Sequence, residues 1–64
     1  MKRTVLLKHL RTNGCFLKRE GGSHSLWVNP QNGRIEAIPR HNEIADNLAR
    51  KICKSLSIPF VMER

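Results

Sequence analysis

The sequence predicts an α+β fold in the order helix, strand, strand, strand, helix, with a three-stranded antiparallel sheet and two helices packed on one face of it. Three observations support this prediction. Apolar residues recur at helical spacing in residues 1–12 and 46–56. Residues 15–38 contain short strand-like runs, and Asn32-Gly33 between two of these runs is the strongest short-range signal of a β-hairpin.

Residues 1–12 are predicted to form an amphipathic helix. Its apolar residues share one face at spacings of three and four residues: Leu6, Leu7 and Leu10. Thr4 is a candidate cap for the start of this helix. Asn13-Gly14 is predicted to end it, because both residues tolerate the left-handed backbone conformation that is common at helix C-termini.

The first two predicted strands lie on either side of a glycine turn. Residues 15–19 form the first strand, residues 20–22 turn the chain, and residues 23–29 form the second strand. One set of alternating side chains in the second strand is His24, Leu26 and Val28. The other set is Ser25, Trp27 and Asn29. Because both sets contain large apolar residues, alternation leaves open which face packs on the helices.

The hairpin leads to a third strand. Residues 30–33 form the turn, and residues 34–38 are predicted to run antiparallel to the second strand. Pro39 is expected to end this strand, because proline has no N–H group to donate to the ladder. A loop from Arg40 to Glu43 then leads toward the last helix.

Residues 46–56 are predicted to form the second helix, and a start as early as Glu43 is also compatible with the pattern. Its apolar stripe recurs every four residues: Ile44, Leu48, Ile52 and Leu56. Asp46 is a candidate N-cap, because its carboxylate can accept hydrogen bonds from the first-turn N–H groups.

We expect a single domain over residues 1–64, with a core over about residues 3–58 and a short tail at 59–64. The apolar residues 60–62 are expected to pack back on the domain or to contact a partner. A domain this small buries only about 60% of the surface of its unfolded chain. Any chemistry must therefore take place near the molecular surface.

The chain is strongly basic. Twelve Lys and Arg against five Asp and Glu give a formal charge of +7 and a pI of about 10.5. This balance predicts a polyanionic ligand, above all a nucleic acid. An acidic protein partner is a second expectation, which is compatible with the first, and a membrane surface is the least favoured ligand.

The remaining composition predicts a cytoplasmic protein without membrane contact. No apolar run is long enough to span a bilayer, and no signal peptide is recognisable. Cys15 and Cys53 do not form a CxxC pair, so we expect two buried, reduced thiols. The spacing of zinc ligands is absent, and we expect neither a metal nor a cofactor.

Gly21-Gly22-Ser23-His24 joins a flexible turn to an imidazole. Glycine lets a phosphate approach the backbone, and imidazole can transfer protons because it titrates near physiological pH. The candidate RNA contacts are residues of this turn and cations near it or on the last helix: Gly22, Ser23, Lys18, Arg19, Lys51 and Lys54.

Taken in order, these residues resemble the HicA family of toxin–antitoxin mRNA interferases, over about residues 3–58. The matching features are Gly22-Ser23-His24, Trp27 three residues later, Ile38-Pro39-Arg40-His41 after the hairpin, and a basic last helix with Leu48 and Ile52. The loop at residues 42–45 departs from the usual pattern, because it lacks the glycine and lysine often found there. This departure counts against a phosphate-binding role for the start of the second helix.

The resemblance implies a type II toxin with a double-stranded-RNA-binding-like fold. It implies a metal-independent endoribonuclease that cleaves mRNA, with His24 as the catalytic general acid or base. It also implies neutralisation by a cognate acidic HicB-type antitoxin that covers this histidine.

Two other functions are compatible with the residues alone. One is a non-catalytic RNA-binding module of the same fold, in which His24 contacts RNA or is structural. The other is an adaptor whose basic face binds an acidic protein. Trp27 is expected in the core, with base stacking as the alternative. His41 is expected as an exposed loop residue, with a contact to RNA or antitoxin as the alternative, and His9 is expected on the helix surface.

Overall fold

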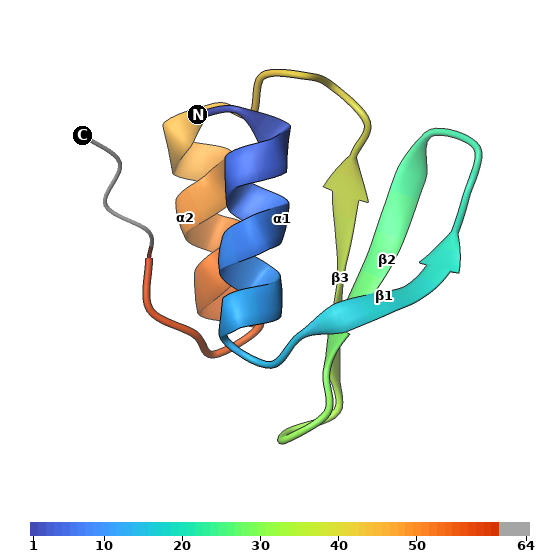
Figure 1. Ribbon diagram of the computed structural model, residues 1–64, viewed down its shortest axis with the longest axis vertical. Coiled ribbons are helices and arrows are strands. Elements are labelled where there is room, and N and C mark those ends of the chain that lie inside the picture. Colours follow the sequence, from blue (N-terminus) through green and yellow to red (C-terminus); the bar gives the residue numbers. More distant parts are fainter. Residues whose placement is uncertain (61–64) are drawn as a thin grey trace.

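The computed structural model describes residues 1–60. Its elements in chain order are α1 (Arg3–Thr12), β1 (Phe16–Glu20), β2 (His24–Asn29), β3 (Arg34–Pro39) and α2 (Asp46–Ser55). The two helices lie side by side on one side of an open sheet (Figure 1). The predicted α-β-β-β-α order and the α+β class are confirmed.

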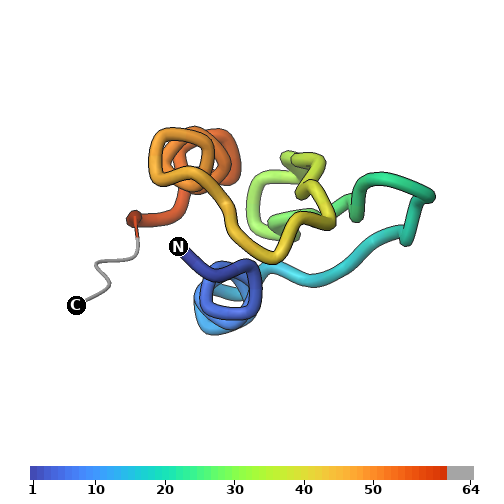
Figure 2. The backbone as a smooth tube through the Cα atoms, turned by 90° about the horizontal axis from the view of Figure 1, so that it is seen from above, coloured from blue at the N-terminus to red at the C-terminus, as the bar shows by residue number. Residues whose placement is uncertain are grey.

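The sheet has the strand order β1-β2-β3 and is antiparallel throughout. Seen from above, both helices stand at the same side of the strands (Figure 2). The β2–β3 hairpin is regular and pairs Asn29 with Arg34 and His24 with Pro39. The β1–β2 register shifts between Leu17 and Arg19, so β1 contains an irregularity there. The turn at residues 30–33 and the end of β3 at Pro39 are confirmed.

Burial decides which face of β2 meets the helices. Ser25, Trp27 and Asn29 are buried, whereas the alternate positions are exposed or partly exposed. Trp27 is only 2% exposed, so it belongs to the core and is no platform for a stacked base. The guanidinium of Arg11 lies over its ring, 5.2 Å from the centroid. The open face carries His24 instead.

The core lies between the sheet and the two helices. Its fully buried aliphatic side chains come from both helices, from β3 and from the flanking loops: Leu6, Leu10, Ile38, Ile44, Ile52 and Leu56. Each such side chain contributes about 1.5–3 kcal/mol when it is removed from water. The predicted stripes of both helices therefore face the core as expected.

Neither helix begins with a side-chain cap. Lys2 occupies the N-cap position of α1 and Ala45 that of α2, and neither makes a side-chain cap hydrogen bond. The expectations for Thr4 and Asp46 were therefore wrong, because both residues lie inside their helices.

Long-range backbone pairing takes the place of caps. Lys2 forms an antiparallel bridge with Glu43. The Arg3 N–H donates to the Asn42 carbonyl at 2.8 Å. The amino group of Met1 lies 3.0 Å from the Glu43 carboxylate, and this hydrogen bond raises the pKa of the amino group. The first residues thus tie the start of α1 to the loop before α2.

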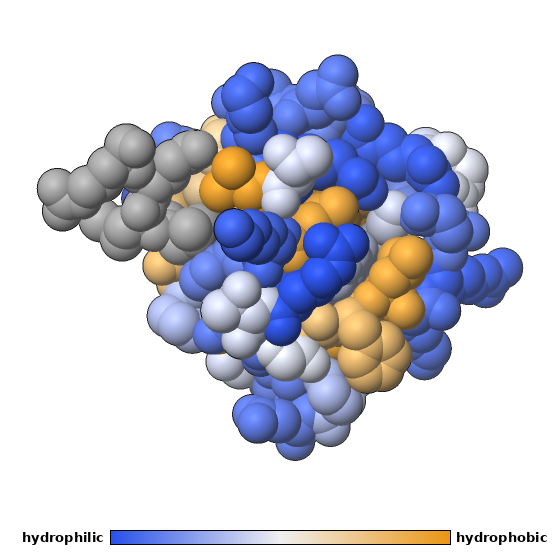
Figure 3. Space-filling view, viewed as in Figure 1, coloured by the Kyte–Doolittle hydropathy of each residue, from blue (hydrophilic) through white to orange (hydrophobic). Residues whose placement is uncertain are grey.

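A row of apolar side chains crosses the open face of the sheet. Phe16 pairs with Val28, which pairs with Ile35 on the other side. Phe16 is 51% exposed and Ile35 44% exposed. In Figure 3, apolar side chains interrupt an otherwise largely hydrophilic surface.

Both cysteines are buried, as expected, and Cys15 is a free thiol whose pKa is raised by burial. Of the apolar tail, Phe60 packs against the core beneath the guanidinium of Arg50, while residues 61 and 62 lie outside the described part of the chain. His9 is partly buried, and its Nε2 donates to the Pro59 carbonyl at 2.6 Å. No helix within residues 1–60 is long and apolar enough to cross a bilayer.

Candidate active site

The turn between β1 and β2 depends on one of its two glycines. The Gly21 N–H donates to the His24 carbonyl at 2.8 Å, which closes the turn. A Cβ added at Gly21 would lie 2.7 Å from that same carbonyl oxygen, whereas nothing lies within 4 Å of a Cβ at Gly22. Sequence reasoning singled out Gly22. The structure shows that Gly21 is the position where a side chain does not fit.

His24 begins β2 directly after this turn, and its side chain is exposed. Its Nδ1 lies 3.1 Å from the Ser23 hydroxyl, close enough for a hydrogen bond. Within residues 1–60, Nε2 makes no hydrogen bond. A neutral imidazole that donates from Nδ1 to the Ser23 oxygen would present the Nε2 lone pair to a ligand.

A groove of about 520 Å³ extends from His24 along β3 to α2. Its lining comes from β2, β3, the loop after β3 and α2: His24, Glu36, Ala37, Pro39, His41, Glu43, Ile44, Ala45, Leu48 and Lys51. The lining contains apolar side chains together with two imidazoles, two carboxylates and one ammonium group. The volume is within the usual range for a site that binds a small molecule or one nucleotide.

Lys51 supplies the positive charge of the groove. Its Nζ lies 3.7 Å from the Glu36 carboxylate, and the lysine side chain is 66% exposed. An ion pair this long and this exposed is weak, because water screens it. The Lys51 ammonium group is therefore accessible to a ligand in the groove, whereas the Glu36 side chain is only 18% exposed.

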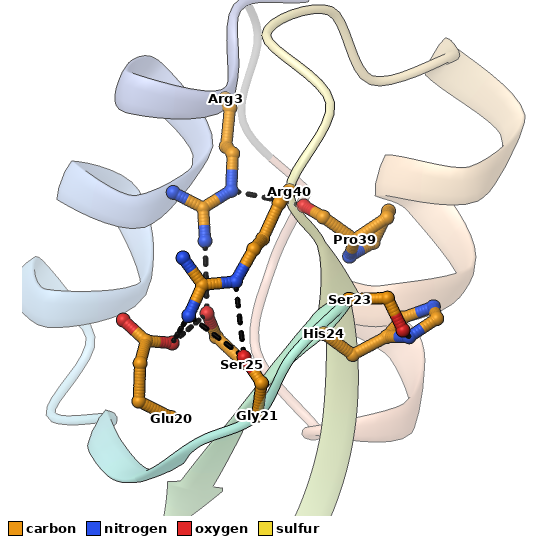
Figure 4. A network of polar contacts seen from close by, with 8 residues as sticks. All are labelled: Arg3, Glu20, Gly21, Ser23, His24, Ser25, Pro39 and Arg40. Carbon is orange, nitrogen blue, oxygen red and sulfur yellow. Dashed lines mark hydrogen bonds and ion pairs between the residues drawn. The ribbon is translucent and has the colours of Figure 1, made fainter.

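Arg40 clamps the turn that carries His24. Its Nη2 and Nε donate to the Gly21 carbonyl at 2.8 and 3.1 Å, and Nη2 lies 3.1 Å from the Glu20 carboxylate. Figure 4 shows the guanidinium over the Glu20–Gly21 end of the turn, with the His24 ring on the other side of the strand. The backbone around the imidazole is thus fixed by an arginine that does not contact the imidazole.

Arg3 forms a second connection behind the same strand end. Its Nε donates to the Pro39 carbonyl at 2.9 Å, and Nη2 donates to the Ser25 hydroxyl at 3.0 Å. The Ser25 hydroxyl in turn donates to the Glu20 carboxylate. The ends of all three strands next to His24 are therefore linked by two arginines, one carboxylate and one buried serine (Figure 4).

The predicted RNA-contact residues do not form one cluster. His24 and Lys51 line the same groove, and Ser23 contacts His24. The other members of the predicted set are exposed outside the groove lining: Gly22, Lys18, Arg19 and Lys54. Lys18 and Arg19 lie on β1, which is the opposite edge strand from β3.

Sequence reasoning missed the residues that support the histidine. Arg40, Glu20 and Arg3 were not singled out for any role, and His41 was expected to be an ordinary loop residue. The sequence did contain one signal for Arg40 and His41. The hairpin register places Pro39 opposite His24, so the two residues that follow Pro39 must lie near this histidine. The role of Arg3 depends on the docking of α1, for which the sequence carries no local signal.

Comparison with known families agrees with this architecture. A family model described as the HicA toxin of bacterial toxin–antitoxin systems matches residues 5–58, which is most of the chain. No curated protein and no solved structure matched. With its helix order, its three-stranded sheet and a match of this extent, the chain belongs to the HicA toxin family of bacterial toxin–antitoxin systems.

Proposed function

We propose that this toxin is a metal-independent endoribonuclease that cleaves mRNA with His24 as general acid or base. Membership of the family gives the toxin role and a cognate antitoxin as partner. The observation that best supports the proposal is the exposed imidazole of His24, held by a clamped turn at a groove that also contains the Lys51 ammonium group.

The proposed reaction uses the reactivity of RNA itself. The 2′-hydroxyl oxygen attacks the adjacent phosphorus, the bond from phosphorus to the 5′-oxygen breaks, and a 2′,3′-cyclic phosphate and a 5′-hydroxyl result. Nε2 of His24 transfers a proton in this step, which is typically worth about 10²–10⁴-fold in rate. Lys51 offsets the negative charge of the phosphate during the reaction.

Binding of RNA is proposed to rest on backbone phosphates. Gly22 and Ser23 would approach a phosphate at the turn, and three exposed cations would extend the contact: Lys18, Arg19 and Lys54. Contacts of this kind give affinity without reading the sequence, and they weaken as salt rises. An acidic HicB-type antitoxin would complement the +7 charge and cover His24.

A cleavage assay in EDTA tests the proposal. Purified protein and its His24→Ala variant are incubated with a long single-stranded RNA, and the fragment ends are analysed. We expect the wild type to leave 2′,3′-cyclic phosphates and the variant to cut at least about 100-fold more slowly. His9→Ala is the matched control, because His9 lies on α1 away from the groove lining.

Thermal unfolding of each variant separates lost chemistry from lost structure. Cleavage by His24→Ala at the wild-type rate would contradict the proposed role of this histidine. Salt-sensitive RNA binding without any cleavage by the wild type would support the non-catalytic RNA-binding module instead. Binding of an acidic protein with no RNA affinity at low salt would support the adaptor.

A further inference from the structure

We infer that His41 is the second proton-transfer group of this reaction and that it acts with His24 on a single unpaired nucleotide held in the groove. This inference rests on the proposed endoribonuclease function and adds to it a second catalytic residue and a substrate class. Two imidazoles line one groove, and residues 1–60 contain only one further histidine, His9 on α1.

The sheet register brings the two histidines together. Pro39 lies directly opposite His24 in the β2–β3 ladder, and His41 follows Pro39 by two residues. Directly opposite residues of an antiparallel pair have Cα atoms about 4.5–5.5 Å apart. The two imidazoles therefore start from neighbouring parts of the backbone, and both are exposed at the groove.

The chemistry needs two groups in opposite protonation states. A neutral base must accept the proton of the 2′-hydroxyl as the bond from O2′ to phosphorus forms. A protonated acid must give a proton to O5′ as its bond to phosphorus breaks. One imidazole cannot be neutral and protonated at the same moment, so a second group speeds the reaction. Exchange with water afterwards restores both groups.

We assign His24 as the base. Its Nδ1 lies within hydrogen-bond distance of the Ser23 hydroxyl, and in the tautomer that donates from Nδ1 the Nε2 atom is an acceptor. His41 is then the acid that protonates the leaving oxygen. The other ionisable groups that line the groove are Glu36, Glu43 and Lys51.

The groove also defines what the histidines can reach. Its accessible apolar lining offers contact to one base: Ala37, Pro39, Ala45 and Leu48. A base that is stacked and paired in a duplex cannot enter a pocket of this kind without being extruded. The substrate class is therefore RNA in which the nucleotide at the cleavage point is unpaired.

A substrate with a better leaving group tests the role of His41. In this RNA a sulfur atom replaces the 5′-oxygen at one linkage, and the thiolate that leaves needs no proton. We expect His41→Ala to cut ordinary RNA about 100-fold more slowly than the wild type but the sulfur substrate within about threefold of it. His24→Ala should be slow on both substrates, and His9→Ala should match the wild type on both.

Several results would overturn the inference. His41→Ala cutting ordinary RNA as fast as the wild type would remove any catalytic role, and an equal loss on both substrates would reduce His41 to a binding residue. Equal cleavage of one linkage in a loop and in a duplex would overturn the substrate class. If the wild type cuts neither substrate, the proposed function fails as well, and this outcome is distinct from failure of a variant alone.

Discussion

The two turns of the sheet are held by different kinds of contact. The β1–β2 turn next to His24 is held by Arg40 and Glu20, whose side chains are 43% and 51% exposed. The β2–β3 turn is held by neutral amides, because Asn29 Nδ2 donates to the Leu56 carbonyl at 2.7 Å and Asn32 Nδ2 donates to it at 3.3 Å. Asn29 is buried, at 3% exposure.

This difference makes the two ends of the sheet respond differently to salt and to other ions. Buried hydrogen bonds between neutral groups are little affected by salt or by other ions, so the hairpin end is a permanent part of the fold. Exposed charged contacts are screened, and a phosphate can compete with Glu20 for Arg40. The turn next to His24 is therefore the end whose contacts salt and anions can weaken.

The largest expected effect on stability comes from the β2–β3 turn, which is held by neutral amides. Asn29→Ala removes the donor to the buried Leu56 carbonyl and the acceptor for the Gln31 N–H. We expect the free energy of unfolding in urea to fall by about 2–3 kcal/mol, because a buried acceptor loses its best partner. Asn32→Ala, on the exposed part of the same turn, should cost less than about 1 kcal/mol. Equal losses in the two variants would remove the contrast between a buried and an exposed anchor.

Substitution of the glycines in the β1–β2 turn is expected to give the next largest effect on stability. Gly21→Ala places a Cβ against the His24 carbonyl, which is a backbone atom and cannot turn away, and we expect a loss of about 1–3 kcal/mol. Gly22→Ala meets open space and should change stability by less than about 0.5 kcal/mol. Urea unfolding measures both variants. A larger loss at Gly22 would mean that the turn has a different conformation.

Loss of the Arg40 contacts to the β1–β2 turn is expected to have the smallest effect on stability. Arg40→Ala should lower the free energy of unfolding by less than about 1 kcal/mol, since exposed ion pairs contribute little. It should nevertheless speed hydrogen exchange at the Gly21 amide and leave the Gly33 amide, which donates to Asn29 in the other turn, unchanged. Arg34→Ala, an exposed arginine at the far end of β3, is the matched control.

Added salt should act on the wild type in the same direction as Arg40→Ala. Salt should speed hydrogen exchange at the Gly21 amide relative to the Gly33 amide, because it screens the charged contacts of the β1–β2 turn and not the neutral contacts of the β2–β3 turn. An Arg40→Ala variant with normal protection at Gly21 would show that the turn holds itself and that Arg40 is incidental.

The sequence predicted the elements well where the signals are local. Asn32-Gly33, the helical stripes and Pro39 each act within a few residues, and the structure has the hairpin, the helices and the strand end where they were expected. The predicted caps, Thr4 and Asp46, were wrong because neither helix has a side-chain cap, and a bridge joins Lys2 to Glu43, which are far apart in the chain. The face of β2 could not be chosen, because both faces carry apolar side chains.

The site was predictable in part. The glycine turn and the place of His24 at the start of β2 follow from the local sequence, whereas the exposure of its side chain is known only from the structure. Arg40 and His41 were within reach, because extending the ladder from the Asn29–Arg34 pair places Pro39 opposite His24. Arg3 was not within reach, because its contact with Pro39 exists only once α1 has docked.

The contact between Arg3 and Pro39 also bears on when the toxin becomes competent. It joins residues 36 positions apart in the chain, and contacts of such separation form late compared with a local hairpin. The two hairpins of the sheet can form from nearby residues alone, but the strand ends around His24 are linked only when the first helix has packed against them. A chain that is still emerging from the ribosome therefore lacks the Arg3 link between the strand ends next to His24 until α1 has docked. Assembly of the site is coupled to completion of the fold.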